Sequence, residues 1–196
     1  MIVLQSTGSE IRLPSKNATV LLSGGIDSAS CAHLLMGQGF NVRGLFVDFG
    51  QAAASMERQA IQAIGAELEI EVETITASAT TRFGTGELVG RNSFLIFSAI
   101  LMGGCQDGLI VLGIHSGTPY FDCSPTFINR IDPLVRECSN GKIAVSSPFL
   151  TWSKSDVFSY FRMSGIPLAL TYSCEAGTSP PCGNCASCGD RALFKC

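Results

Sequence analysis

Charged side chains are scarce in this 196-residue chain, where they make up 15% of the residues. Sixteen acidic residues against 13 basic ones leave a net charge of −3, so the broad basic surface typical of nucleic-acid-binding proteins is absent. The longest apolar run covers only the eleven residues 94–104, whereas a membrane-spanning helix needs about 20. The first residues also lack the basic and then apolar stretches of a secretory leader. We therefore expect a cytoplasmic protein that binds neither nucleic acid nor membranes.

Apolar residues are plentiful, at 46% of the chain, and the length suits one domain with a buried core. Strand-like segments alternate with helix-like segments, and no internal repeat is present. This alternation predicts an α/β fold, namely a doubly wound, mostly parallel sheet with helices on both faces. Strands are expected over 18–23, 42–48, 69–75 and 109–114, and helices over 27–36, 53–65, 92–103, 125–136 and 153–163.

Some of these segments carry a more specific expectation. The strand 69–75 alternates apolar and polar residues, which is typical of an edge strand. The helix 92–103 is apolar nearly all round, which predicts burial on every side. Gly65 is expected to end the second helix, and Ser153 with Asp156 fits a capping box. We expect the isolated cysteines Cys31, Cys105 and Cys138 to be small buried side chains.

An SGGIDS segment at residues 23–28 stands between the first expected strand and the first expected helix. Its two glycines let the backbone approach a ligand closely, and N–H groups at a helix start can bind an anion together with serine hydroxyls. No Gly-Lys-Ser/Thr follows, so this is not a Walker loop. The alternative is an ordinary glycine turn. Phosphate binding is predicted for Ser23, Gly24, Gly25, Ile26, Asp27 and Ser28.

Four of the nine cysteines crowd together near the C-terminus, with the spacing C-x7-C-x2-C-x2-C. In a reducing compartment such a group indicates a metal site rather than disulfides. Four thiolates can close a tetrahedral structural site whose usual occupant is Zn²⁺, and an iron–sulfur cluster is the rival. We expect residues 172–196 to form a zinc-binding appendage packed on the domain 1–171. Its predicted ligands are Cys174, Cys182, Cys185 and Cys188.

The loop and the cysteines together resemble a known family. SGGIDS is similar to the PP-loop of N-type ATP pyrophosphatases, and several further short blocks resemble the 7-cyano-7-deazaguanine synthases of queuosine biosynthesis over roughly residues 18–194. These blocks are VDFGQ at 47–51, GRN at 90–92, GIH at 113–115, FDC at 121–123 and the cysteine run. The resemblance implies an ATP-dependent carbon–nitrogen ligase with the cofactors ATP, Mg²⁺ and Zn²⁺, acting as a homodimer.

The reaction implied by this resemblance has three stages. ATP adenylates the carboxylate of 7-carboxy-7-deazaguanine with release of pyrophosphate. Ammonia then displaces AMP to give an amide, and a second ATP activates the amide for dehydration to the nitrile. Activation is needed because a carboxylate oxygen is a poor leaving group, whereas AMP leaves readily from a mixed anhydride.

The resemblance also implies roles for single residues. Catalysis is assigned to Asp27, Arg91 and Lys154, and the planar fork of Arg91 suits either a phosphate or a carboxylate. Nucleotide binding beyond the SGGIDS segment is assigned to Asp48, Gln51, Gly90, Arg91, Asn92 and Gly113. Binding of the deazaguanine is assigned to His115, Tyr120, Phe121 and Asp122, with Asp122 accepting from the ring N–H edge and an aromatic ring stacking on the base.

The chain departs from the family pattern at three places. Ala52 and Ala53 stand where the family usually has Arg-His, Ser124 stands in place of an Arg, and Val89 stands in place of a Pro. Two alternatives therefore stay open: an anti-phage-defence paralogue that joins the activated carboxylate to an amine of a partner protein, and a nucleotide-binding module without catalysis. A tRNA-thiolating or lysidine-forming enzyme is disfavoured by the net charge of −3.

Overall fold

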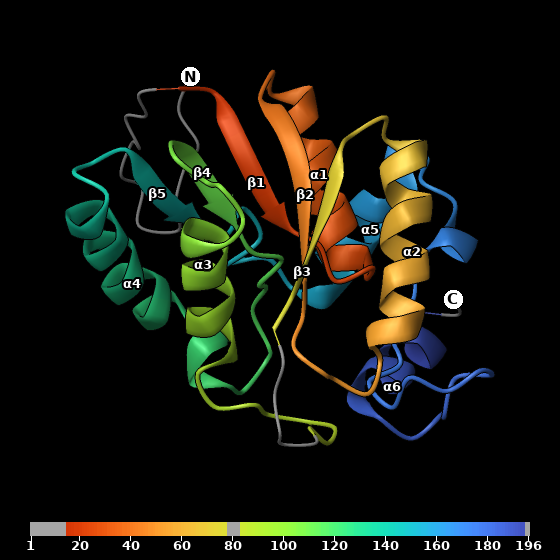
Figure 1. The fold of residues 1–196 in the computed structure, drawn as a ribbon. Coiled ribbons are helices and arrows are strands. Elements are labelled where there is room, and N and C mark those ends of the chain that lie inside the picture. Colours follow the sequence, from red (N-terminus) through yellow and green to blue (C-terminus); the bar gives the residue numbers. More distant parts are fainter. Residues whose placement is uncertain (1–14, 78–82, 195–196) are drawn as a thin grey trace.

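A five-stranded parallel sheet forms the centre of the computed structural model, which describes residues 15–77 and 83–194 (Figure 1). The strand order is β3-β2-β1-β4-β5, and every neighbouring pair runs parallel. This confirms the predicted doubly wound parallel fold. The strands are β1 (Asn17–Leu21), β2 (Asn41–Asp48), β3 (Val72–Thr76), β4 (Gly108–Val111) and β5 (Ile143–Ser146).

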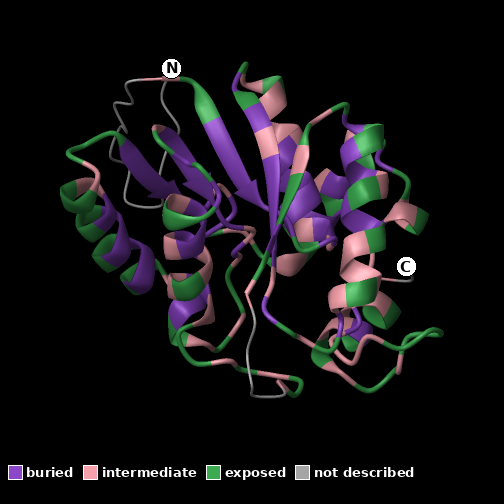
Figure 2. Ribbon diagram, viewed as in Figure 1, coloured by how far each residue is buried: buried purple, intermediate pink, exposed green. Residues whose placement is uncertain are grey.

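Helices cover both faces of this sheet (Figures 1 and 2). Three helices pack on one face, namely α1 (Ile26–Gly37), α2 (Ala54–Glu67) and α5 (Lys154–Ser164). Two pack on the other face, namely α3 (Arg91–Leu101) and α4 (Pro125–Cys138). A short helix, α6 (Ala186–Leu193), belongs to the C-terminal segment.

The central strands are apolar on both faces because each face has its own layer of helices. On β4, Leu109 and Val111 join the core under α1 and α5, whereas Ile110 joins the core under α3 and α4. All three side chains are fully buried, and each such burial stabilises the fold by about 1.5–3 kcal/mol. The two cores hold the strand ends, and therefore the loops that follow them, in fixed positions.

The start of α5 has a well-defined cap. The Ser153 hydroxyl accepts a hydrogen bond from the Asp156 N–H (3.2 Å), and the Asp156 carboxylate accepts one from the Ser153 N–H (2.9 Å). This is the predicted capping box. It makes Lys154 the first residue of the helix, at the end of the sheet where the SGGIDS segment lies.

The sequence predicted one edge strand of the sheet but not the other. β3 lies at one edge, as its alternating pattern predicted. β5 lies at the other edge and was not predicted, since its four residues give too short a run to show a period. The prediction that Gly65 ends the second helix is wrong, because α2 continues to Glu67. A Cβ at Gly65 would lie 2.5 Å from a methyl group of Val72, so this glycine allows α2 to approach β3.

Two expectations about burial are also wrong. α3 buries only one side, and Leu101 at its end is 86% exposed. The preceding Val89 is 94% exposed, so the apolar character of this segment exceeds what the sheet can cover. Cys138 is exposed at the end of α4, whereas Cys31 and Cys105 are buried as expected.

The C-terminal segment lies at the carboxyl ends of the strands, below α2 in Figure 1. The Tyr172 N–H donates to the Gly24 carbonyl (2.8 Å), which ties this segment to the SGGIDS loop. The Phe194 ring stacks on Phe158 of α5, with 5.1 Å between the ring centroids. Within residues 15–77 and 83–194, none of the helices combines the length and apolar character needed to cross a membrane.

Candidate active site

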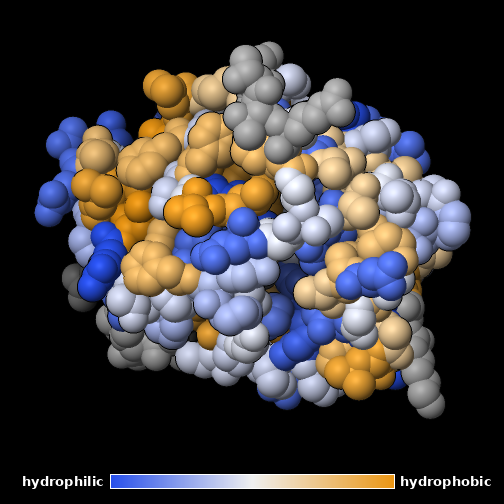
Figure 3. All heavy atoms as spheres, turned by 90° about the horizontal axis from the view of Figure 1, so that it is seen from below, coloured by the Kyte–Doolittle hydropathy of each residue, from blue (hydrophilic) through white to orange (hydrophobic). Residues whose placement is uncertain are grey.

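The candidate site is a cavity of about 680 Å³ at the carboxyl ends of the strands. β1 and β4 are neighbours there, although their connections leave toward opposite sides of the sheet. Such a switch point is where open α/β sheets bind ligands, and the volume lies in the range of small-molecule sites. Seen from below, this face is hollowed near its centre and lined there by hydrophilic residues (Figure 3).

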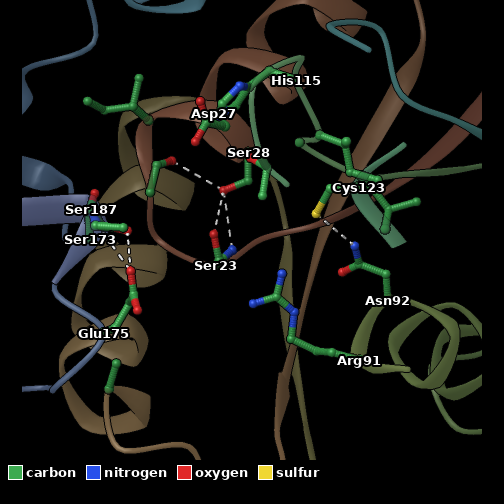
Figure 4. A pocket seen from close by; sticks show the side chains of 18 of the residues that line it. Ser23, Asp27, Ser28, Arg91, Asn92, His115, Cys123, Ser173, Glu175 and Ser187 are labelled. Atoms are coloured by element: carbon green, nitrogen blue, oxygen red, sulfur yellow. Dashed lines mark hydrogen bonds between the residues drawn. The ribbon is translucent and has the colours of Figure 1, made fainter. Parts of the chain in front are cut away.

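The SGGIDS loop forms one wall of the cavity (Figure 4). The Ser28 hydroxyl accepts from the Ser23 N–H (3.2 Å) and donates to the Gly25 carbonyl (3.2 Å), which folds the loop back on itself. Gly24 has a φ of +77°, and a Cβ there would lie 2.8 Å from Ala60. The N-cap residue of α1 is Gly25, which has no side chain to cap the first turn. Its N–H groups are therefore available to an anion.

Asp27 and Lys154 form an ion pair across the mouth of this loop. The Lys154 Nζ lies 2.6 and 2.9 Å from the two oxygens of the Asp27 carboxylate. Both side chains are about three-quarters buried, and a second carboxylate, Asp190, lies 4.0 Å from the same Nζ. The pair holds the ammonium group beside the phosphate loop, so two predicted catalytic residues are brought together.

Arg91 is the third predicted catalytic residue, and it differs from Lys154 because its charge is not paired. It is the first residue of α3 and lines the cavity. Within the part of the chain that the structure describes, no side chain or backbone group forms a hydrogen bond or ion pair with its guanidinium. The side chain extends from α3 toward Ser23 (Figure 4). An unpaired planar cation facing an anion cradle suits a phosphate or a carboxylate ligand.

Glu57 is a cavity-lining carboxylate that the sequence reasoning missed. Its Oε2 accepts a hydrogen bond from the Gln51 side chain (2.8 Å). Burial raises the pKa of Glu57, although the hydrogen bond from Gln51 and the charge of Arg91 oppose that rise. The Gln51 amide is used internally, since its oxygen accepts from the Phe49 N–H (2.9 Å). Gln51 therefore braces the turn after β2 and orients Glu57.

The residues predicted to bind the deazaguanine separate into two groups. His115 and Tyr120 line the cavity. Asp122 and Phe121 are not among its lining residues. Asp122 is buried and accepts from the Asn92 N–H (3.1 Å), so it caps the start of α3. Phe121 is 55% exposed and packs on Phe127 outside the cavity.

Only some of the other residues predicted to bind the nucleotide line the cavity. Asn92 lines the cavity, but its amide donates to the Asp122 carbonyl (2.8 Å). Gly113 also lines it, and a Cβ there would lie 2.8 Å from the Ser28 nitrogen, so glycine permits close packing on α1. Asp48 forms an ion pair with Arg58, and neither Asp48 nor Gly90 belongs to the lining.

Cys123 also lines the cavity, next to Asn92 (Figure 4). Burial, together with the nearby charge of Asp122, raises the pKa of Cys123 to about 11. The thiol is therefore protonated at neutral pH, and a thiol in that state is a poor nucleophile. The cavity is suited to binding and activating anions rather than to chemistry on a cysteine.

The four predicted metal ligands come together in a cluster that we call the knuckle, Cys174–Cys188. Their sulfur atoms all lie within 4.8 Å of one another, and Zn–S bonds of about 2.3 Å would place the sulfurs roughly 3.8 Å apart. Burial opposes ionisation of Cys174, yet the N–H groups of Cys182 and Ala176 lower its pKa to about 5. Burial raises the pKa of Cys188 to about 12. The donor set and its spacing fit a tetrahedral metal ion.

The segment around the knuckle also contributes to the cavity wall. Tyr172, Ser173, Glu175 and Ser187 are among its lining residues. The Arg191 guanidinium donates to the Ser173 hydroxyl (3.2 Å), which fixes this wall beside the phosphate loop. The four-cysteine region is thus part of the site and not a remote appendage.

The family model of the queuosine biosynthesis protein QueC matches residues 17–94 and 87–193, which include both the phosphate loop and the knuckle. The chain belongs to the QueC family. A 7-cyano-7-deazaguanine synthase of Halobacterium salinarum is 28% identical over 91% of this chain and 90% of its own length. One from Prochlorococcus marinus is 31% identical over 88% of this chain and 91% of its own length.

A solved structure resembles this QueC family chain in fold. The NMN synthetase from Francisella tularensis matches with a TM-score of 0.56 and 18% sequence identity, over 93% of this chain and 78% of that one. At this identity the likeness shows the fold alone. It agrees with the five-stranded parallel sheet.

Two acidic residues in this QueC family chain carried sequence signals that were overlooked. Glu57 lies on the apolar stripe of α2, between Ala53 and Ala60, and a carboxylate in that position indicates a special role. Glu175 directly follows the predicted metal ligand Cys174. Neither signal identifies the group that donates a hydrogen bond to the carboxylate.

Proposed function

We propose that this QueC family chain is an ATP-dependent carbon–nitrogen ligase of the cytoplasm that converts 7-carboxy-7-deazaguanine and ammonia into 7-cyano-7-deazaguanine. The observation that carries the proposal is the unpaired Arg91 guanidinium facing the uncapped phosphate loop inside one cavity. The names of the most similar relatives support the substrate.

Different polar groups of the cavity would bind the two anionic reactants, ATP and the substrate carboxylate. ATP with its Mg²⁺ is a substrate, and its pyrophosphate end suits the N–H groups and hydroxyls of residues 23–28. Lys154, oriented by Asp27, stands at the same loop and offsets phosphate charge. Arg91 faces this loop from α3, where it can hold the substrate carboxylate against the α-phosphate. Positioning two reactants and stabilising the charge that develops between them are the main means of catalysis in such a site.

The proposed chemistry proceeds through an acyl adenylate. A carboxylate oxygen attacks the α-phosphorus and pyrophosphate leaves. Ammonia then attacks the acyl carbon, loses a proton and expels AMP, which gives the amide. The amide oxygen then attacks the α-phosphorus of a second ATP and pyrophosphate leaves. The amide nitrogen loses its two protons as the oxygen departs as part of AMP, which leaves the nitrile. His115, Tyr120 and Asn92 line the cavity where the deazaguanine ring would lie.

We also propose that the knuckle binds one structural Zn²⁺, since four thiolates leave no open coordination position. Leu101 of α3 and Val89, which lies just before α3, are exposed apolar residues, and we propose that they lie in a homodimer interface. Leu101→Asp should then lower the mass measured by light scattering to that of a single chain. An unchanged dimer mass would contradict this assignment.

A second candidate function is supported by Ala52. This residue lines the cavity at a position where the family usually carries a cation. Compared with the family pattern, the cavity therefore has less positive charge and more space beside Ala52. A larger amine, such as one on a partner protein, could then attack the same acyl adenylate. We propose this reaction as the alternative, in the context of anti-phage defence.

One assay separates these proposals. Purified protein is incubated with ATP, Mg²⁺, 7-carboxy-7-deazaguanine and ammonium, and nucleotides and bases are followed by mass spectrometry. AMP with nitrile is the expected result. AMP or a trapped adenylate without amide or nitrile would favour the partner-protein reaction. Absence of AMP formation above that of the Asp27→Ala variant would contradict both.

A further inference from the structure

The Glu175 carboxylate joins two parts of the molecule that are distant in sequence. Its Oε2 accepts a hydrogen bond from the Gly86 N–H (3.0 Å). Its Oε1 accepts from the Ser187 N–H (3.3 Å) and from the Ser187 hydroxyl (3.0 Å) (Figure 4). Three donors thus converge on one carboxylate. Hydrogen bonds to an ionised acceptor are stronger than those between neutral groups.

The two ends of this connection have different roles. Glu175 follows the ligand Cys174, and Ser187 precedes the ligand Cys188. Gly86 belongs to the loop 83–90, which leads directly into Arg91. Gly84, Thr85, Gly86 and Leu88 of this loop line the cavity. Glu175 therefore links the metal-binding cluster to the loop that carries the unpaired arginine.

The loop 83–90 has little packing of its own. Gly84, Thr85, Glu87, Val89 and Gly90 are all exposed. The ring of Phe83 packs on Phe49 at the start of the loop, and the Arg91 N–H donates to the Leu88 carbonyl at its end. Between these two ends, Leu88 packs against the core under α3 and α4, and the hydrogen bond from Gly86 to Glu175 connects the loop to the knuckle. Segments with few buried contacts open at low free-energy cost.

We propose that Glu175 is a positioning residue, which couples the metal state of the knuckle to the placement of the loop 83–90 and so of Arg91. A metal ion held by Cys174 and Cys188 fixes the backbone next to Glu175 and next to Ser187, and the Glu175 carboxylate then holds the Gly86 N–H. Without the metal, these neighbours are free to move, and the loop loses its central anchor. The coupling is reciprocal, so a fixed loop also favours metal retention.

The test compares loop opening with and without metal. Hydrogen–deuterium exchange of the peptide covering 83–91 is measured in wild type, Glu175→Ala and Glu175→Gln, each before and after chelation. Glu87→Ala is the matched control, because Glu87 lies in the same loop, is exposed and does not line the cavity. Metal content is determined for every sample. None of these readouts requires enzymatic activity.

The proposal predicts a non-additive result. Chelation should speed exchange of the loop about 10-fold in wild type and in the control, an effect of about 1.4 kcal/mol on opening. Metal-loaded Glu175→Ala should already exchange at the faster rate, and chelation should add little. Equal acceleration by chelation in wild type and Glu175→Ala would overturn the coupling. So would wild-type exchange in the metal-loaded variant, or metal retention in Glu175→Ala equal to that of wild type, since reciprocal coupling requires the variant to hold its metal less tightly.

The consequence for activity rests on the proposed function. Because Arg91 is placed through the loop, Glu175→Ala should raise the KM for the carboxylate substrate several-fold more than it lowers kcat, while the KM for ATP stays near wild type. Glu175→Gln, which keeps one acceptor oxygen, should recover part of this effect. Equal changes in both KM values would contradict the positioning role. Failure of the proposed reaction itself would leave the exchange test unaffected.

Discussion

The phosphate loop and the knuckle face the same cavity, but they are held in different ways. The loop 23–28 lies between Leu22 and Ala29, and both are buried in the core under α1. In the segment 172–194, the buried residues are Cys174 and Cys188. The loop thus takes its shape from apolar packing that extends through the whole domain. The knuckle has almost no apolar core, so under the proposed zinc binding its shape would depend on the metal ion.

This contrast teaches that one site can combine two sources of order. Packing of strands and helices places Ser23, Asp27 and Lys154, and it persists whenever the domain is folded. Glu175 and Ser187 lie beside cysteines of the knuckle, which we propose to be held by a metal ion. Losing the metal should therefore change half of the cavity wall while the other half stays intact.

Replacing one ligand should produce the largest effect. Cys185→Ser removes a thiolate, and structural zinc in small peptides contributes about 10–16 kcal/mol of apparent binding free energy. We expect metal content to fall well below one ion per chain and exchange protection in 172–194 to be lost, with the sheet still protected. Elemental analysis and exchange mass spectrometry measure both. Cys138→Ser, at an exposed cysteine of α4, is the control; full metal content in Cys185→Ser would remove this residue from the site.

The next substitution lies in the loop 23–28, the part of the cavity wall that is held by apolar packing. Asp27→Ala leaves Lys154 without its main partner beside the phosphate loop, so AMP formation should fall about 100-fold or more, in the range seen for lost electrostatic stabilisation. Metal content and the melting temperature should stay close to wild type. Chromatographic detection of AMP and a thermal melt test this. Unchanged turnover would contradict the assignment of the phosphate loop.

Arg91 lies where the two halves meet, and a conservative change should have an intermediate effect. Arg91→Lys keeps the charge but loses the planar fork that binds an anion through two hydrogen bonds. We expect the KM for the carboxylate substrate to rise about 10-fold, which corresponds to about 1.4 kcal/mol. Steady-state kinetics with each substrate varied in turn measure the change. An equal rise for ATP alone would instead place Arg91 on the phosphates.

Glu57 should give the smallest effect, and one that depends on pH. Its pKa is raised in the folded protein by burial, so the protonated carboxyl favours folding at low pH, and that stability is lost as the pH rises through the folded-state pKa. Glu57→Gln mimics the protonated form and can keep the contact with Gln51. We expect a small rise in melting temperature at pH 8 and a smaller one at pH 4.5. A larger gain at the lower pH would contradict the direction of the pKa shift.

Local patterns predicted much of the fold. The strand–loop–helix unit at 18–36, the capping box at Ser153 and the edge position of β3 follow from signals within a few residues, and all three are confirmed. β5 was missed because four apolar residues, Ile143–Ser146, show no period. α3 was mistaken for a buried helix because apolar composition does not reveal how much of a surface the sheet can cover.

The candidate site was less predictable from the sequence. Asp122 and Arg91 are both polar residues in motif-like blocks, yet one caps α3 while the other points into the cavity. The neighbouring residues in the sequence do not determine which way each side chain points. The direction of Arg91 depends on the rotation of α3, to which the burial of Ile96 and Ala99 contributes, and on the loop 83–90 that leads into it. The direction of Asp122 depends on where the turn Phe121–Cys123 lies beside α3.

The sequence by itself determined the sheet class, the phosphate loop and the identity of the four grouped cysteines, because each depends on residues that are neighbours along the chain. Only the tertiary structure decided which charges are paired. Asp27 meets Lys154 across 127 positions and Glu175 meets the Gly86 N–H across 89. The Arg91 guanidinium forms no hydrogen bond or ion pair among the described residues, although its charge acts on Glu57. These outcomes depend on how helices pack across the sheet, since packing brings distant residues within hydrogen-bond range and leaves others facing the cavity.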